Sequence, residues 1–355
     1  MLARVGLAVP SYALDVDRRV VSRLRARLYA AVRLSLTGMG YEEVETPCLV
    51  PAPGMEPHID AFEARFVPEG GGAPRSLWLH TSPEYAMKRL LADGFERIFQ
   101  IARVFRNGEV SPTHNPEFTL LEMYRAGTDY QGIMRDVEVV IEACARSIAG
   151  GTRLIAAGLA LDLAAPFERV TVADAFARYA GVDLAACRGD EAELRRALSS
   201  AGVAGIRATD AFDDLFFRAF LEKIEPALAG SGRPAFVVDW PAPMAALARL
   251  RRSDPTWAER FELYAGGLEL ANGFSELTDA DEQRRRLEEE RALRRRLARA
   301  AYPLDERFLG ALRRMPEAGG VAVGLDRLLM LLAGAGSIDE VLLFPACDFL
   351  TDDLT

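Results

Sequence analysis

Hydrophobic and polar positions follow two different periods along this chain, which predicts a mixture of helices and strands. Apolar residues recur every three or four positions over Val16 to Leu36, which predicts an amphipathic helix that ends at the glycines Gly38 and Gly40. Asp279 to Ala300 predicts a second long helix. Its dense Arg and Glu positions are typical of a solvated helix face rather than of a binding tail.

Shorter apolar or alternating runs, bounded by turn residues, predict a series of strands. The strands are expected at Tyr41 to Val44, Trp78 to Thr81, Ile98 to Arg106, Phe118 to Arg125 and Phe236 to Trp240, with a hairpin at Phe261 to Phe274 and a strand, turn and helix at Gly319 to Gly336. Ser82-Pro83-Glu84 provides a cap, a first-turn proline and a first-turn acid for a helix after the second strand.

The segment 131–229 is rich in alanine and contains no obvious chemistry, so we expect a helical insertion there. The strands around it follow one another with short links, a pattern that favours an antiparallel sheet flanked by helices. The sequence therefore predicts an α+β fold, in a single domain spanning 1–355.

Composition narrows the classes of protein that remain. The chain has 355 residues, 50% of them hydrophobic, and no apolar run near the roughly 20 residues that a membrane span needs. Met1 to Pro10 does not resemble a cleaved signal peptide. Four scattered cysteines and three histidines provide no zinc-binding spacing and are consistent with a cytoplasmic protein. The net charge of −9 argues against a large phosphate-binding surface for nucleic acid.

The predicted hairpin contains the first group of chemically informative residues. A two-residue turn at Gly266-Gly267 sets Tyr264 opposite Glu269 and Leu263 opposite Leu270, so that Glu262, Tyr264 and Glu269 share one face. Carboxylates on one face repel each other unless a cation lies there, and Glu276 follows soon after. The hairpin is either half solvated or an acidic site for Mg²⁺ and a substrate amine, because both cations pair with carboxylates.

Two further groups place arginines beside ligand-sized openings. Arg106 ends a strand next to a polar loop, where its planar guanidinium suits a phosphate, and Phe118 can stack on a base. Gly324 permits close approach of a ligand to the backbone, and Arg327 follows at a helix start. Each feature alone also fits a surface arginine or a bulged strand. Together with the acidic hairpin they indicate a site for ATP and a cationic amino acid.

These segments resemble the class II aminoacyl-tRNA synthetases. G-Y-E-E-V-E-T-P, which ends at Pro47, is similar to motif 1, the dimer-forming segment of that family. F-R-N … H-N-P-E-F-T-L-L-E-M-Y (105–124) is similar to motif 2, and G-V-A-V-G-L-D-R-L (320–328) to motif 3. T-S-P-E (81–84) and L-E-L-A-N-G-F-S-E-L (268–277) resemble the lysyl branch. The resemblance extends from about Arg18 to Phe344 and implies an ATP-dependent amino-acid-activating enzyme.

The resemblance also assigns roles to individual residues. It implies ATP contacts at Arg106, Asn107, Gly108, Asn115, Phe118, Glu269, Leu270, Gly324 and Arg327, of which Arg106, Glu269 and Arg327 are the catalytic candidates. It implies an amino-acid pocket at Ser82, Pro83, Glu84, Tyr124, Glu276 and Ala322, and Mg²⁺ at Glu269 and Glu276. The sequence departs from the family at Gly108, where a glutamate is usual, and Glu109 is the expected substitute. It departs again at Ala322, where glycine is usual.

A truncated branch of the family fits best. Motif 1 begins about forty residues after Met1, which leaves no room for the anticodon-binding domain of lysyl-tRNA synthetases, and the acidic charge agrees with weak tRNA binding. The chain resembles the elongation factor P–(R)-β-lysine ligase family. That resemblance implies a homodimer that activates (R)-β-lysine with ATP and transfers it to elongation factor P. The alternatives are an enzyme that activates α-lysine for tRNA or another acceptor, and a non-catalytic regulatory paralogue.

Overall fold

The computed structural model describes residues 17–156 and 158–350. The predictions for Met1 to Pro10 and for Val16 therefore lie outside the described residues. Within them the helices are α1 (Arg18–Gly38), α2 (Glu84–Ala92), α3 (Tyr130–Ala149), α4 (Val172–Ala175), α5 (Leu184–Cys187), α6 (Glu191–Ser200), α7 (Phe212–Ala219), α8 (Glu225–Ala229), α9 (Ala280–Arg296), α10 (Glu306–Leu312) and α11 (Leu325–Ala333). No helix in the described part of the chain is long and apolar enough to cross a bilayer.

An eight-stranded sheet is the centre of the fold, with the strand order β1-β5-β6-β13-β12-β11-β10-β9. Its members are β1 (Glu42–Glu43), β5 (Arg97–Phe105), β6 (Glu117–Ala126), β9 (Glu168–Thr171), β10 (Ala235–Pro241), β11 (Trp257–Ala265), β12 (Leu268–Ser275) and β13 (Ala318–Gly324). The interior pairs are antiparallel, and only the outer pairs β1–β5 and β9–β10 are parallel. The predicted α+β class is confirmed, with a sheet that is mixed at its edges.

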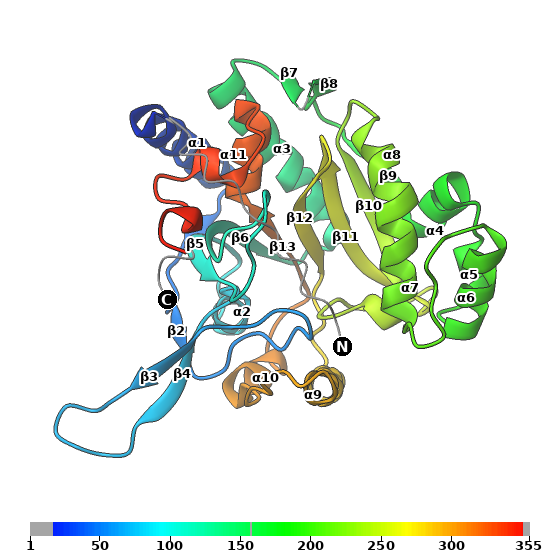
Figure 1. Cartoon of the computed structure of the whole chain (residues 1–355). Helices are drawn as coiled ribbons and strands as arrows, with labels where there is room; N and C mark the ends of the chain where they lie inside the picture. Colours follow the sequence, from blue (N-terminus) through cyan, green and yellow to red (C-terminus); the bar gives the residue numbers. More distant parts are fainter. Residues whose placement is uncertain (1–16, 157, 351–355) are drawn as a thin grey trace.

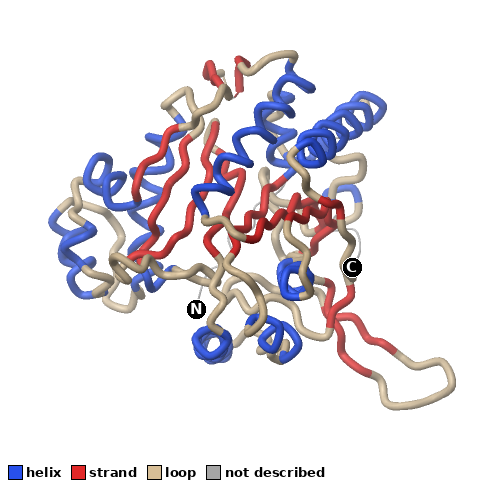
Figure 2. The backbone as a smooth tube through the Cα atoms, turned by 180° about the vertical axis from the view of Figure 1, so that it is seen from behind, coloured by secondary structure: helices blue, strands red, loops and turns tan. Residues whose placement is uncertain are grey.

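Three helices cover one face of the sheet. α1, α3 and α11 pack their apolar positions into one cluster with the strands. In Figure 2, which views the molecule from behind, α3 crosses in front of the sheet. Leu28 and Val32 of α1, for example, are fully buried in this cluster. The opposite face of the sheet is left to polar residues of the same strands, because successive side chains of a strand alternate between the two faces.

The expected helical insertion at 131–229 is wrong at its first boundary. α3 is a core helix whose buried positions face the sheet, and β9 is an edge strand of that sheet. Between them β7 (Arg153–Ala156) and β8 (Leu159–Asp162) form a small hairpin. Only Val172 onward is a separate helical subdomain, visible as the green helices on the right of Figure 1, with its own apolar cluster. The alanine-rich composition is shared by both parts, which explains the error.

A second small sheet projects from the body of the protein. β2 (Leu49–Val50), β4 (Arg75–Leu79) and β3 (Glu63–Phe66) form it in that order, and the β3–β4 hairpin extends outward in Figure 1. The segment between β2 and β3, residues 51–62, passes close to the polar face of the large sheet. Its position matters for the site described below.

A buried ion pair joins the helical layer to the sheet. Nη1 of Arg25 on α1 lies 2.5 Å from Oδ1 of Asp326 at the start of α11, and Oδ2 of Asp326 accepts the backbone N–H of Thr119 on β6 at 2.7 Å. Both charged side chains are buried, so each depends on the other to offset its lost hydration. The pair fixes the turn that leads from β13 into Arg327.

Replacing Arg25 by methionine should therefore destabilise the fold. Arg25→Met leaves the Asp326 carboxylate buried without its partner, and we expect the free energy of unfolding to fall by about 3–5 kcal/mol. Arg27→Met, at an exposed position of the same helix, should change it by less than about 0.5 kcal/mol. Urea denaturation followed by circular dichroism measures both; equal midpoints for the two variants would contradict the role of the pair.

Candidate active site

The register of the central strands lines up polar residues in a row across the sheet. Gln100, Glu122, Ala322, Asn272 and Glu262 pair in succession from β5 to β11, so their side chains share one face. A cavity of about 330 Å³ lies over this row and contacts all of these residues except Gln100. The next row contains Tyr124, Gly320, Phe274 and Arg260, all of which line the same cavity.

Carboxylates gather at the end of the cavity near α2. Oε1 of Glu122 accepts hydrogen bonds from Ser82 Oγ at 3.0 Å and from Tyr124 O–H at 2.8 Å, while its Oε2 is buried without a partner among the described residues. Burial and the charge of Glu84 raise the pKa of Glu122 to about 8. A buried carboxylate with an unused oxygen is suited to a cationic ligand group.

Lys88 supplies a positive charge within the acidic cluster formed by Glu84, Glu122 and Glu276. Its Nζ lies 2.5 Å from Glu84 Oε1 and 2.5 Å from Glu276 Oε2, and its side chain is fully buried between the rings of Phe274 and Phe308. Burial lowers the pKa of Lys88, but the charges of Glu276 and Glu84 outweigh it and raise the pKa above its usual value. Lys88 is therefore charged at neutral pH and fixes both carboxylates.

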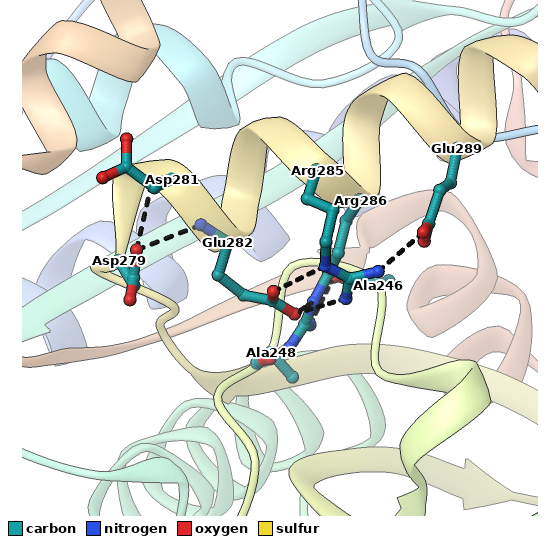
Figure 3. A network of polar contacts seen from close by, with 8 residues as sticks. All are labelled: Ala246, Ala248, Asp279, Asp281, Glu282, Arg285, Arg286 and Glu289. Carbon is teal, nitrogen blue, oxygen red and sulfur yellow. Dashed lines mark hydrogen bonds and ion pairs between the residues drawn. The ribbon is translucent and has the colours of Figure 1, made fainter.

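The position of Glu276 depends on a network around α9 (Figure 3). Arg286 of α9 donates to the carbonyl oxygens of Ala246 and Ala248, both at 2.9 Å, and Glu282 accepts from Arg286 and Arg285. Ala248 in turn forms a β-bridge with Glu276. The charged helix predicted at Asp279 to Ala300 is thus not only a solvated surface, because one of its arginines holds the segment beside the acidic cluster.

The other end of the cavity is rich in arginine. Arg327 donates to His114 Nε2, to the carbonyl of Glu269 at 3.0 Å and to that of Thr113 at 3.2 Å. Arg106 lies over the ring of Phe118, 5.1 Å from its centroid, and its Nε has no partner among the described residues. Two guanidinium groups lie at this end of the cavity, and such planar groups are suited to phosphate oxygens.

His114 at this end is neutral at physiological pH. Burial and the charges of Arg327 and Arg106 lower its pKa to about 4. Because an arginine cannot accept a hydrogen bond, Nε2 must be the acceptor and the proton must lie on Nδ1, next to Ser111 Oγ at 2.7 Å. His114 therefore orients Arg327 without adding a positive charge.

The hairpin β11–β12 has the predicted turn but a shifted register. Tyr264 pairs with Glu269 as expected, whereas Leu263 pairs with Ala271 because Leu270 is an extra residue in β12. Such a bulge flips the alternation of the following residues. As a result Glu262, Glu269 and Asn272 all line the cavity.

The structure brings most of the predicted site residues together. The cavity is lined by Ser82, Glu84, Arg106, Asn115, Phe118, Tyr124, Glu269, Leu270, Ala322, Gly324 and Arg327. Pro83, Asn107, Gly108 and Glu276 do not line it. Gly108 has a φ of +84°, which favours glycine, and the following Glu109 lines the cavity and lies 3.9 Å from Arg106. Asn115 faces the cavity, but its amide also joins the loop to the backbone N–H of Ala346.

The two carboxylates at which Mg²⁺ is expected, Glu269 and Glu276, lie too far apart to bind a single ion. Glu269 lies near the start of β12 and Glu276 directly follows its end, seven residues later, which corresponds to roughly 23 Å at about 3.3 Å per residue. Glu276 is also paired with Lys88 and is buried against Gly320. A Cβ added at Gly320 would collide with Oε1 of Glu276. Glu269 remains near the arginines and Glu262. The described residues contain no cluster of three or more His, Cys, Asp or Glu side chains that could hold a metal ion.

Sequence reasoning missed several residues of the site. Lys88 is four residues after Glu84, a spacing that in isolation indicates an exposed helical ion pair. The cavity is also lined by Arg260, His114 and Glu56. Arg260 connects Glu262 and Asn272 at 2.6 and 3.2 Å, and only the strand register reveals that link. Glu56 lies in a loop that has no periodicity to interpret.

A comparison with protein families agrees with this geometry. The family described as tRNA synthetases class II (D, K and N) matches residues 14–348 of the chain. The chain belongs to this family. Its enzymes are ligases, and the relatives named below support an ATP-dependent amino acid ligase.

Two kinds of relative within the class II family are similar to this chain. The lysine–tRNA ligase of Gloeobacter violaceus is 39% identical over 328 residues, which cover 92% of this chain and 64% of that ligase. The chain thus spans less than two thirds of this relative. The elongation factor P–(R)-β-lysine ligase of Pectobacterium atrosepticum is 40% identical over 322 residues, which cover 90% of this chain and 93% of that ligase.

Removing the charge of Lys88 should weaken amino-acid binding in a pH-dependent way. Burial raises the pKa of Glu122, which lines the cavity, to about 8 although the charge of Lys88 lowers it, so affinity for an ammonium group should increase as the pH rises through that value. Lys88→Met removes the cation that opposes this rise and should move the acid limb of kcat/KM for the amino acid at least about one unit higher, equivalent to about 1.4 kcal/mol. The pH profile of pyrophosphate exchange is the measurement.

Two controls for Lys88→Met use the same assay: the KM for ATP and the variant Arg89→Met. The KM for ATP should change by less than about twofold, because Lys88 contacts only the amine end of the site. Arg89→Met, the neighbouring cation on α2, should leave the pH profile in place. An unmoved acid limb in Lys88→Met would show that Lys88 does not set the charge of this cluster.

Proposed function

We propose that this class II synthetase-like ligase activates (R)-β-lysine with ATP and transfers it to a lysine side chain of elongation factor P. The observation that supports it most strongly is the division of one cavity into an acidic end and an arginine end. A diamino acid has two ammonium groups for the carboxylates and one carboxylate that must reach the phosphate end. No other common substrate class matches both ends as well.

The proposed first step is attack by the substrate carboxylate on the α-phosphorus of ATP. A bond forms between a carboxylate oxygen and phosphorus, the bond to the bridging oxygen breaks, and pyrophosphate leaves. Arg106, with its unpartnered Nε, is placed to stabilise the charge that develops on the phosphate oxygens, and Arg327 to bind the departing phosphates. Holding both reactants in one cavity supplies much of the rate increase.

The second step transfers the acyl group to an acceptor amine. A neutral lysine ε-amine attacks the carbonyl carbon of the adenylate and an amide bond forms. The anhydride C–O bond breaks, AMP leaves with the oxygen that joined the carbonyl carbon to phosphorus, and the amine loses a proton. The neutral His114 stays on Arg327 throughout and takes no part in the proton transfer. The chain therefore needs no covalent intermediate of its own.

Mg²⁺ is proposed as the cofactor, at the arginine end of the cavity. Glu269 is half-exposed there, and Glu262 lies near it on the same face. One or two carboxylates fit the way Mg²⁺ usually binds, with substrate phosphates and water as its remaining ligands. The ion would neutralise phosphate charge when bound; the residues themselves position the phosphates and the carboxylate.

The choice of acceptor rests on the comparisons. An elongation factor P–(R)-β-lysine ligase is 40% identical to this chain over 322 residues. The net charge of −9 also disfavours a stable complex with tRNA. We further propose a homodimer formed through the segment near Pro47, where Pro47 and Leu49 expose apolar surface beside the sheet edge.

The acceptor can be identified by measuring the intact mass of elongation factor P after the reaction. Elongation factor P incubated with the enzyme, ATP, Mg²⁺ and (R)-β-lysine should gain the mass of one β-lysyl group, and should gain much less with α-lysine. A parallel reaction with tRNA(Lys) should give no aminoacyl-tRNA. Efficient charging of the tRNA with α-lysine, and an unmodified elongation factor P, would instead support the lysyl-tRNA synthetase alternative.

Ala322 is the residue proposed to select the β-amino acid. Ala322 lies between Glu122 and Asn272 in the row of residues that crosses the sheet, and it lines the cavity. The related lysyl enzymes usually have glycine at this position. A single methyl group in a pocket typically discriminates by about 1–3 kcal/mol, or roughly 10–200-fold. Ala322→Gly should therefore raise kcat/KM for α-lysine relative to β-lysine in pyrophosphate exchange. An unchanged ratio would leave Ala322 without a role in selectivity.

A further inference from the structure

We propose that Glu56 is a further substrate-binding carboxylate, which pairs with the ammonium group nearest the carboxylate of a diamino acid. This inference rests on the proposed activation of such an acid and adds a residue outside the motifs already discussed. Glu56 lies in the segment between β2 and β3, and it lines the cavity together with Ser82 and Glu84.

The backbone around Glu56 is held rigidly. Nη1 of Arg294 donates to the carbonyl oxygens of Glu56 and Ile59, both at 2.7 Å, and its Nη2 lies 2.6 Å from Asp60 Oδ1. Arg294 is fully buried and lies over the ring of Tyr302, 4.4 Å from its centroid. The hydrogen bonds from this buried arginine to the loop carbonyls hold the segment in one position.

The side chain of Glu56 folds back into the cavity over a glycine. A Cβ at Gly54 would collide with Oε2 of Glu56, so this conformation requires glycine there. Oε2 is buried and has no hydrogen-bond partner among the described residues. An ionised oxygen removed from water without a partner is costly, and the cost is relieved when a ligand supplies a cation.

Glu56 lines the cavity together with residues of both of its ends, Glu84 and Arg106. Burial raises its pKa, its own backbone N–H lowers it, the charge of Glu84 raises it again, and Arg106 and Arg294 lower it. The carboxylate of Glu56 therefore interacts electrostatically with Glu84, in the acidic cluster, and with Arg106, at the phosphate end. The substrate carboxylate must lie near Arg106 to attack phosphorus, so Glu56 faces the amine next to that carboxylate, while Glu122 and Tyr124 face the distal amine.

A ligand pair isolates the contribution of the proximal amine. α-Lysine has both amines, whereas 6-aminohexanoate has the distal amine and the carboxylate but lacks the proximal amine. Dissociation constants of both for the full-length enzyme, measured by calorimetry, form a cycle with the variant Glu56→Gln. We expect Glu56→Gln to weaken α-lysine binding at least tenfold and 6-aminohexanoate binding less than twofold.

Two further variants separate binding from folding. Glu290→Gln alters a half-buried acidic neighbour that does not line the cavity and should change neither constant. Glu56→Asp keeps the charge and should retain more of the preference for α-lysine than Glu56→Gln, which tests the inference even if the glutamine variant is unstable.

The outcomes distinguish this inference from the proposed function. Equal weakening of both ligands by Glu56→Gln, or no weakening of α-lysine, overturns the role of Glu56 while the wild type still binds a diamino acid. Wild-type enzyme that binds neither α-lysine nor (R)-β-lysine would instead count against the proposed function itself.

Discussion

The register of β13 between β6 and β12 is the constraint on which the rest of the site depends. Ala322 is opposite both Glu122 and Asn272, and Gly320 is opposite both Tyr124 and Phe274. A slip of one residue would turn every one of these side chains to the other face of the sheet. The small residues of β13 also leave the space in which the substrate is proposed to lie, because Gly320 has no Cβ between two aromatic neighbours.

Charge separation along the cavity follows from this framework. α2 supplies Glu84 and Lys88 at one end, and the loop before β6 supplies Arg106 and its neighbours at the other. Buried charges need partners, and here most partners are within the protein: Lys88 for Glu276, Arg260 for Glu262. Glu122 and Glu56 line the cavity, and each has a buried carboxylate oxygen without a hydrogen-bond partner among the described residues, so these two groups are the most informative about the ligand.

Sequence reasoning predicted the fold well where apolar runs had clear limits. The strands at Ile98 to Arg106 and Phe118 to Arg125 are β5 and β6 almost to the residue, because each is a mainly apolar run that borders a polar loop. It failed at 131–171, where composition could not separate a core helix from an insertion. It also could not predict the bulge at Leu270, because one extra residue in a strand leaves no mark on composition.

The candidate site was predictable to the extent that motifs carry it. Arg106, Glu269 and Arg327 were assigned by resemblance and do meet at one end of the cavity. Lys88 and Glu56 could not be assigned, because their importance comes from contacts between distant segments: Lys88 with Glu276, and the Glu56 loop with Arg294 on α9. Such pairings are determined by tertiary packing, and no local pattern in the chain reports them.

The most direct test of the central claim is amino-acid-dependent pyrophosphate exchange into ATP by the purified protein. The account predicts exchange with a diamino acid, either isomer of lysine, and loss of at least about a hundredfold with norleucine, which lacks the distal amine that Glu122 and Tyr124 face. Exchange that is equally fast with norleucine, or absent with every amino acid, would contradict the reading of this cavity as a site for a diamino acid and ATP.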